Sequence, residues 1–151
     1  QGALLGVQGM NGPISADGTA GSAAIFQSFR SGAWDAYASR FVFVTDADVE
    51  AQQLRSIAPG GSLGTVANLP NVPSSLTYRH DSTHDLVYYC GRDDRILHKY
   101  DVSSSTDTTL DWPIAKMECS GRAMVYSSTR NSIVFPFTQD GIAGVAEYLN
   151  P

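Results

Sequence analysis

The segment RHDSTHD, residues Arg79 to Asp85, holds the side chains whose types and spacing come closest to a chemical site. His80 and His84 are each followed by an aspartate, and imidazole and carboxylate groups are common zinc ligands and acid/base catalysts. A His-x-x-x-His spacing brings both rings to one side only in a helix, whereas Asp, Ser and Thr here favour a chain reversal. We therefore expect a turn between two strands, with a divalent-metal site at His80, His84 and Asp85 as the alternative.

Two further carboxylates are weaker candidates for catalysis. Asp48 lies in TDADVE, where acids alternate as at the start of a calcium loop, but the glycine and distal glutamate of an EF-hand are missing. Asp93 lies in RDDR, a charge run that is typical of a solvated turn. The chain has no Gly-x-Ser-x-Gly, phosphate-loop or Cys-x-x-Cys motif. The acid/base candidates are thus His80, His84, Asp93 and Asp48, no cofactor other than a divalent metal is suggested, and the sequence leans against an enzyme.

Aromatic residues beside acids suggest a different chemistry. Trp34 and Tyr37 lie in SGAWDAYAS next to Asp35, and Trp112 lies in LDWP next to Asp111. We expect both stretches to be connecting segments. An exposed ring can stack on the apolar face of a sugar while the neighbouring acid accepts hydroxyl hydrogens, so these five residues are candidates for ligand binding. In the alternative interpretation, each tryptophan fills a gap between neighbouring structural units.

The acidic composition limits the partners of the chain. Its 151 residues have a formal net charge of −5, so we expect neither nucleic acid nor an anionic membrane surface as a partner. No window approaches the roughly 20 apolar residues of a membrane-spanning helix. The start at Gln1, without an initiator methionine, favours a processed and secreted protein.

The two cysteines support the same location. Cys90 and Cys119 make an even count, and disulfides persist mainly in extracellular proteins. We expect a bridge between them, and two buried free thiols are the alternative.

The elements that position these residues are predicted to be strands. The best helix candidate, Asp46 to Ile57, has a poor apolar face. Short runs rich in β-branched and aromatic residues are frequent and are bounded by turn formers. The predicted strands are Arg40–Val44, Ser75–Arg79, Asp85–Cys90, Arg95–Val102, Ala123–Ser127, Ser132–Phe137 and Gly144–Leu149.

The N-terminal stretch differs from the remainder of the chain. Six glycines lie among the first 21 residues, so residues 1–30 are expected to form an irregular arm with one short strand at Ala3–Val7. Ser103–Thr109 is expected to be a loop and Ala58–Ser62 a tight turn.

An internal repeat organises residues 31–151. Segments that begin at Arg40, Asp85 and Ser132 each run from an apolar strand through a polar turn into a weaker strand. Phe41, Leu86 and Ile133 correspond, and so do Asp48, Asp93 and Asp140. The expected repeats lie near 31–70, 74–112 and 121–151, with a unit of about 45 residues, which is the size of a β-propeller blade.

With FVFVTDADVEAQQLRSI followed by GGSLGTVANLP, and LVYYCGRDDRILHKYDV preceded by SLTYRHDSTHD, the chain resembles the lactonase-like and YVTN-type β-propellers. The resemblance implies an all-β fold of antiparallel meanders. Three blades are too few to close a ring. We therefore expect a homo-oligomer or a second chain to complete the β structure, and a β-sandwich is the alternative.

The expected function is that of a secreted recognition protein that binds a carbohydrate or a partner at a host or cell surface, because no nucleophile, base and orienting group are assembled. A second hypothesis, implied by the resemblance, is a hydrolase or lactonase with a metal or acid/base site. A third is a processed chain of a larger propeller.

Overall fold

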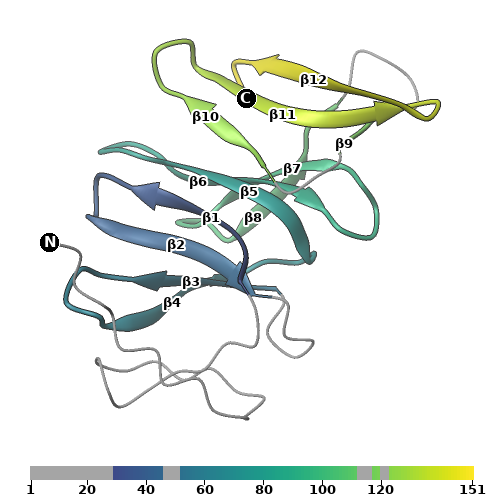
Figure 1. Ribbon diagram of the computed structural model, residues 1–151. Coiled ribbons are helices and arrows are strands. Elements are labelled where there is room, and N and C mark those ends of the chain that lie inside the picture. The colour runs from purple at the N-terminus through teal and green to yellow at the C-terminus, as the bar shows by residue number, and fades with distance from the viewer. Residues whose placement is uncertain (1–28, 46–51, 112–116, 120–122) are drawn as a thin grey trace, which may run out of the picture.

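The computed structural model of this chain describes residues 29–45, 52–111, 117–119 and 123–151. Within these ranges the protein is all-β, with twelve strands and no helix. The strands form three antiparallel sheets that follow one another along the chain and lie one above another in Figure 1. None of these residues belongs to a helix that could cross a membrane.

The first two sheets are meanders in which neighbouring strands in the sequence pair with one another, and in the third sheet β10, β11 and β12 form a meander while β9 also pairs with β11. The first sheet contains β1 (Phe29–Asp35), β2 (Arg40–Thr45), β3 (Gln53–Ile57) and β4 (Leu63–Asn68). The second contains β5 (Pro73–His80), β6 (Asp85–Gly91), β7 (Leu97–Asp101) and β8 (Thr106–Thr109). The third contains β9 (Met117–Cys119), β10 (Val125–Ser127), β11 (Ser132–Gln139) and β12 (Ile142–Leu149).

The predicted correspondence of Phe41, Leu86 and Ile133 is confirmed by the strand register. Each is the second residue of its strand, β2, β6 or β11. Each lies opposite one residue of the preceding strand and one of the following strand. The preceding partners are Trp34, Arg79 and Tyr126, and the following partners are Ile57, Asp101 and Tyr148.

The second sheet is buried on both of its faces. Val87 and Tyr89 of β6 belong to a core cluster shared with the first sheet, and Leu86, Tyr88 and Cys90 belong to a cluster shared with the third. Successive strand residues point to opposite faces, so a strand covered on both sides needs apolar residues at every position. This explains the uninterrupted run LVYYC.

Side-chain hydroxyls connect β1 of the first sheet to β5 of the second, and β5 to β10 of the third. Ser31 Oγ on β1 accepts a hydrogen bond of 3.1 Å from the backbone N–H of Leu76 on β5. Thr77 Oγ1 on β5 accepts one of 3.0 Å from the N–H of Tyr126 on β10. These bonds satisfy backbone donors that face a neighbouring sheet rather than a neighbouring strand.

Replacing Thr77 by valine is therefore expected to lower the free energy of unfolding by about 2 kcal/mol, because the Tyr126 N–H loses its acceptor beside the core. Thr77→Ser keeps the hydroxyl and loses one methyl group, so we expect a loss of about 0.8 kcal/mol. Urea denaturation of both variants measures the difference. Equal losses would show that the hydroxyl contributes nothing.

The predicted disulfide between Cys90 and Cys119 is confirmed. It connects β6 of the second sheet to β9 of the third, across 29 residues of sequence, with a Cα–Cα distance of 5.9 Å. Both cysteines are 1% exposed and lie in the core cluster between these sheets. The disulfide thus joins the two sheets at their shared core.

Two strands occupy segments that the sequence patterns placed in loops. Trp34 lies in β1, although its segment was predicted to connect strands. The apolar alternation of β1 is weak because it contains Gly32, which allows β2 to approach closely. A Cβ at Gly32 would lie 2.6 Å from the carbonyl oxygen of Val42 and 2.7 Å from the ring of Phe41. The predicted loop 103–109 contains β8, whose residues TDTT pair with β7 without an apolar face.

The segment Asp46–Ile57, which was the best of the poor helix candidates, ends in a strand as the repeat predicts, because Gln53–Ile57 form β3. The remainder of that candidate, together with Ala3–Val7 and most of the N-terminal arm, lies outside the described residues.

Pro136 shows how β11 accommodates a residue without an N–H. On one edge β11 pairs with β12, where Pro136 lies opposite Val145. On its other edge, β10 pairs with residues 132–134 and β9 with residues 137–139. Pro136 therefore lies at the break between these two short strands, where no described strand requires its missing donor.

Candidate functional site

The first strands of the first and second sheets end side by side, and their last residues make contact. Asp35 ends β1 and His80 ends β5, and His80 Nδ1 lies 2.8 Å from Asp35 Oδ2. The two residues are 45 positions apart in the sequence. Packing of the two sheets therefore joins the candidate metal segment to the candidate sugar-binding segment.

The Asp35 carboxylate is enclosed by donors. It accepts hydrogen bonds from His80 Nδ1, from Arg40 Nε at 2.9 Å and from the backbone N–H of Ala38 at 3.1 Å, and its side chain is 0% exposed. Burial alone would raise the pKa of Asp35, but the hydrogen bonds from His80, Ala38 and Arg40 outweigh it and hold the pKa below its ordinary value. Asp35 is thus closed to a ligand, contrary to its predicted role as an acceptor for sugar hydroxyls. It fixes the orientation of His80 instead.

Asp85 also has a partner within the protein. Tyr78 donates its hydroxyl hydrogen to Asp85 Oδ1, and the Tyr78 oxygen accepts a bond of 3.3 Å from Arg40. Burial, followed by the interactions with Asp85, raises the pKa of Tyr78. The carboxylate that was a candidate metal ligand is therefore used to satisfy a buried phenol.

The residues between His80 and Asp85 form the predicted turn. Asp81 Oδ1 accepts bonds from the Thr83 N–H at 2.8 Å, from the Thr83 hydroxyl at 2.8 Å and from the His84 N–H at 3.0 Å. The bonds from Thr83, the backbone one first, lower the pKa of Asp81. This pattern is an Asx turn, in which the aspartate side chain stabilises the reversal.

The two histidines face different partners in this turn. His84 Nδ1 lies 3.0 Å from Asp81 Oδ1, whereas His80 Nδ1 faces Asp35. Among the residues that the structure describes, no three His, Cys, Asp or Glu side chains are grouped as metal ligands would be. The geometry thus separates His80, His84 and Asp85 into three different pairs.

A polar pocket lies next to His80. Its volume is about 280 Å³, and it is lined by Tyr37, His80, the turn residues 81–85 and Ser103. Tyr37 is 61% exposed, and its ring is tilted against the His80 ring with centroids 4.7 Å apart. In the described part of the chain, the Nε2 atom of His80 has no hydrogen-bond partner. We call this site the Tyr37 pocket.

The other candidates for ligand binding lie elsewhere. Trp34 is 57% exposed, but it precedes Asp35 directly in β1 and does not line the pocket. Asp111 follows β8, which runs away from the turn that holds Ser103. Asp48 and Trp112 lie outside the described residues.

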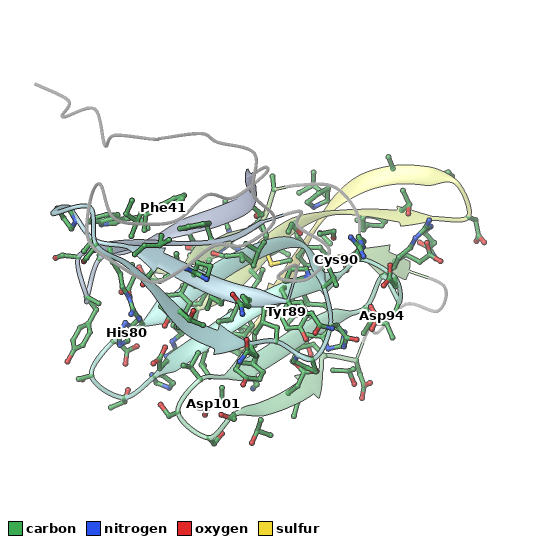
Figure 2. All side chains as sticks on the ribbon, turned by 90° about the horizontal axis from the view of Figure 1, so that it is seen from below. Phe41, His80, Tyr89, Cys90, Asp94 and Asp101 are labelled. Carbon is green, nitrogen blue, oxygen red and sulfur yellow. A yellow bond between two sulfur atoms is a disulfide. The ribbon has the colours of Figure 1, made fainter. Side chains whose placement is uncertain are left out.

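Asp93 is separated from the pocket by the length of β6. It lies in the turn that follows Gly91, whereas His80 precedes the other end of the same strand. Figure 2 shows His80 and Asp94, the neighbour of Asp93, at opposite ends of the sheets. The side chain of Asp93 is 81% exposed and pairs with Arg92 at 3.3 Å, so the four acid/base candidates do not form one site.

A buried histidine that sequence patterns did not single out lies at that second end. His98 has a side chain that is 3% exposed, with Nδ1 2.8 Å from Asp107 and Nε2 3.0 Å from Asp94. Its ring stacks on the Tyr89 ring with centroids 4.7 Å apart, and the Tyr89 hydroxyl donates a hydrogen bond of 2.9 Å to Asp107 Oδ1. Burial, followed by the charge of Asp107, raises the pKa of Tyr89.

This second cluster is closed, since both ring nitrogens of His98 already face carboxylates. It stabilises the second sheet by connecting β7 with β8 and with the turn after β6. The alternation of RILHKYDV could have revealed it, because that pattern puts His98 and Tyr100 on the same face as each other.

Comparison of the chain with protein-family models, with curated proteins and with solved structures finds no match in any of the three.

Proposed function

We propose that this protein is a secreted, non-enzymatic recognition protein that binds a carbohydrate in the Tyr37 pocket. The observation that supports this most is the exposed Tyr37 ring at the rim of a pocket whose other walls are hydroxyl, carboxylate and imidazole groups. A carbohydrate offers an apolar face for stacking and many hydroxyls for hydrogen bonds, which matches such a surface.

The Asp35–His80 pair supports hydroxyl recognition. When Nδ1 donates to the ionised Asp35, Nε2 of the neutral ring has a free lone pair and accepts a hydrogen bond. A ligand hydroxyl is a suitable donor. Because Asp35 is buried and held by three donors, His80 is oriented before the ligand arrives, which lowers the entropic cost of binding.

A glycan array followed by calorimetric titration of the best ligand tests this proposal. Tyr37→Ala is expected to weaken binding about tenfold or more, a loss of about 1.4 kcal/mol, because the stacking surface is removed. Trp34→Ala is the matched control, since Trp34 is similarly exposed but lies outside the pocket. The proposal fails if no glycan binds, or if binding depends on Trp34 and not on Tyr37.

A hydrolase of the lactonase type is the second candidate, and the same histidine favours it. A histidine held by a buried carboxylate is the usual form of a general base. No described hydroxyl is hydrogen-bonded to His80, so the nucleophile under this hypothesis is water. Ligand turnover that is lost in His80→Ala would support the enzyme, whereas binding without turnover supports recognition.

We further propose that the three sheets are blades of a β-propeller of the lactonase-like or YVTN type. The meander order, the corresponding positions of Phe41, Leu86 and Ile133, and the hydroxyl links between β1, β5 and β10 support this assignment. Closure of a ring requires further blades beyond these three. Secretion agrees with the disulfide between Cys90 and Cys119.

A further inference from the structure

Among the described residues, the third sheet has no strand beyond β12 at the position that β4 and β8 occupy in the other two sheets. In the first and second sheets, a fourth strand pairs antiparallel with the third, β4 with β3 and β8 with β7. In the third sheet, β9 and β10 share one edge of β11, and β12 occupies its other edge. No described strand pairs with the outer edge of β12, which corresponds to the position of β4 and β8.

The edge of β12 has none of the features that usually prevent strand addition. Such features are short length, bulges, proline and several charges. The edge strand β8 has four residues, and the pairing of β4 with β3 contains a register shift. In contrast, β12 pairs with β11 over eight consecutive residues without a shift, and Glu147 is its only charged residue.

Large apolar side chains of β12 are exposed along its length. Ile142 and Val145 are each 73% exposed and Leu149 is 57% exposed. Val145 and Leu149 point to the same face of the third sheet, because they lie an even number of residues apart. Exposed apolar residues on an unprotected edge mark a surface for association.

We infer that β12 pairs antiparallel with β12 of a second copy of this chain. A two-fold axis perpendicular to the sheet relates two β12 strands as an antiparallel pair, which is the direction in which β4 and β8 pair in the other two sheets. A register centred on Val145 keeps the faces of both sheets aligned. It puts the two Val145 residues opposite each other and Glu147 opposite Ala143 of the second copy, so no like charges meet across the interface.

The oligomeric state of the full chain, measured by light scattering over a concentration series, tests this inference. We expect the wild-type mass to approach that of two chains as concentration rises. Val145→Lys puts two ammonium groups opposite each other at the axis and is expected to raise the dimer dissociation constant about tenfold or more. Val125→Lys is the control, because Val125 is also an exposed valine, at 61%, but lies on β10.

Cross-linking provides a second measurement with the register as its readout. Directly opposed residues in antiparallel strands have Cα atoms about 4.5 to 5.5 Å apart, a distance that a disulfide spans. Oxidised Val145→Cys is therefore expected to form a covalent dimer, and Val125→Cys is expected to remain monomeric under denaturing conditions. A wild-type chain that stays monomeric at every concentration, or a dimer that Val145→Lys leaves intact, would overturn the inference.

Discussion

Replacing both Cys90 and Cys119 by alanine is expected to lower the free energy of unfolding by about 3 to 4 kcal/mol. The disulfide closes a loop with a sequence separation of 29 residues, and the chain-entropy model assigns about that energy to a loop of this length. Both sulfur atoms also lie in the core between the second and third sheets, so lost packing adds to the effect. Equilibrium denaturation in guanidinium measures the loss.

Reduction of the wild-type protein serves as the control for this prediction. A reductant is expected to shift the wild-type denaturation midpoint towards that of the double variant and to leave the variant itself unchanged. If the reduced wild-type protein and the oxidised protein unfold at the same midpoint, the disulfide does not stabilise the contact between these sheets.

Replacing His98 by leucine is expected to lower the free energy of unfolding by about 2 to 3 kcal/mol. The substitution leaves Asp94 and Asp107, which are 34% and 20% exposed, without the ring nitrogens that they now face. Leaving two partly buried carboxylates without this hydrogen-bond partner costs more than removing a partner from an exposed carboxylate. The loss is measured by urea denaturation.

His84 provides the matched control for His98. Its side chain is 39% exposed, and its partner Asp81 is 45% exposed, so the same substitution there is expected to cost about 0.5 kcal/mol or less. A coupling test compares Asp94→Asn, His98→Leu and the double variant. The losses in unfolding free energy of the two single variants are expected to sum to more than the loss of the double variant. Equal costs for His84→Leu and His98→Leu would contradict a structural role for the buried network.

The strands were most predictable where burial on two faces fixes the pattern. The run LVYYC of β6 needs apolar residues at each position because two sheets cover it. The strand β1 was missed because its glycine and polar residues are required by close approach and by a bond between sheets. Gly32 makes room for Phe41, and the Ser31 hydroxyl accepts the Leu76 N–H, so neither residue adds to an apolar alternation.

The pocket was predicted only in separate parts. Tyr37 and the turn after His80 were candidates for different chemistries, and nothing in the local sequence relates them. Their contact depends on how β1 packs beside β5, which is a property of the folded sheets. The same packing turns Asp35 away from a ligand and towards His80, an outcome that the exposure of neighbouring Trp34 and Tyr37 does not reveal.

The most direct test of the proposed recognition site is a nuclear magnetic resonance titration of the side-chain signals of Tyr37, His80 and His98 with the glycan that binds best. Binding in the Tyr37 pocket is expected to shift the ring signals of Tyr37 and His80 with one common dissociation constant. The His98 ring lies at the other end of the sheets in a closed cluster, so its signals are expected to stay in place. Shifts confined to other residues, or no shift at saturating glycan, would contradict the proposed binding site.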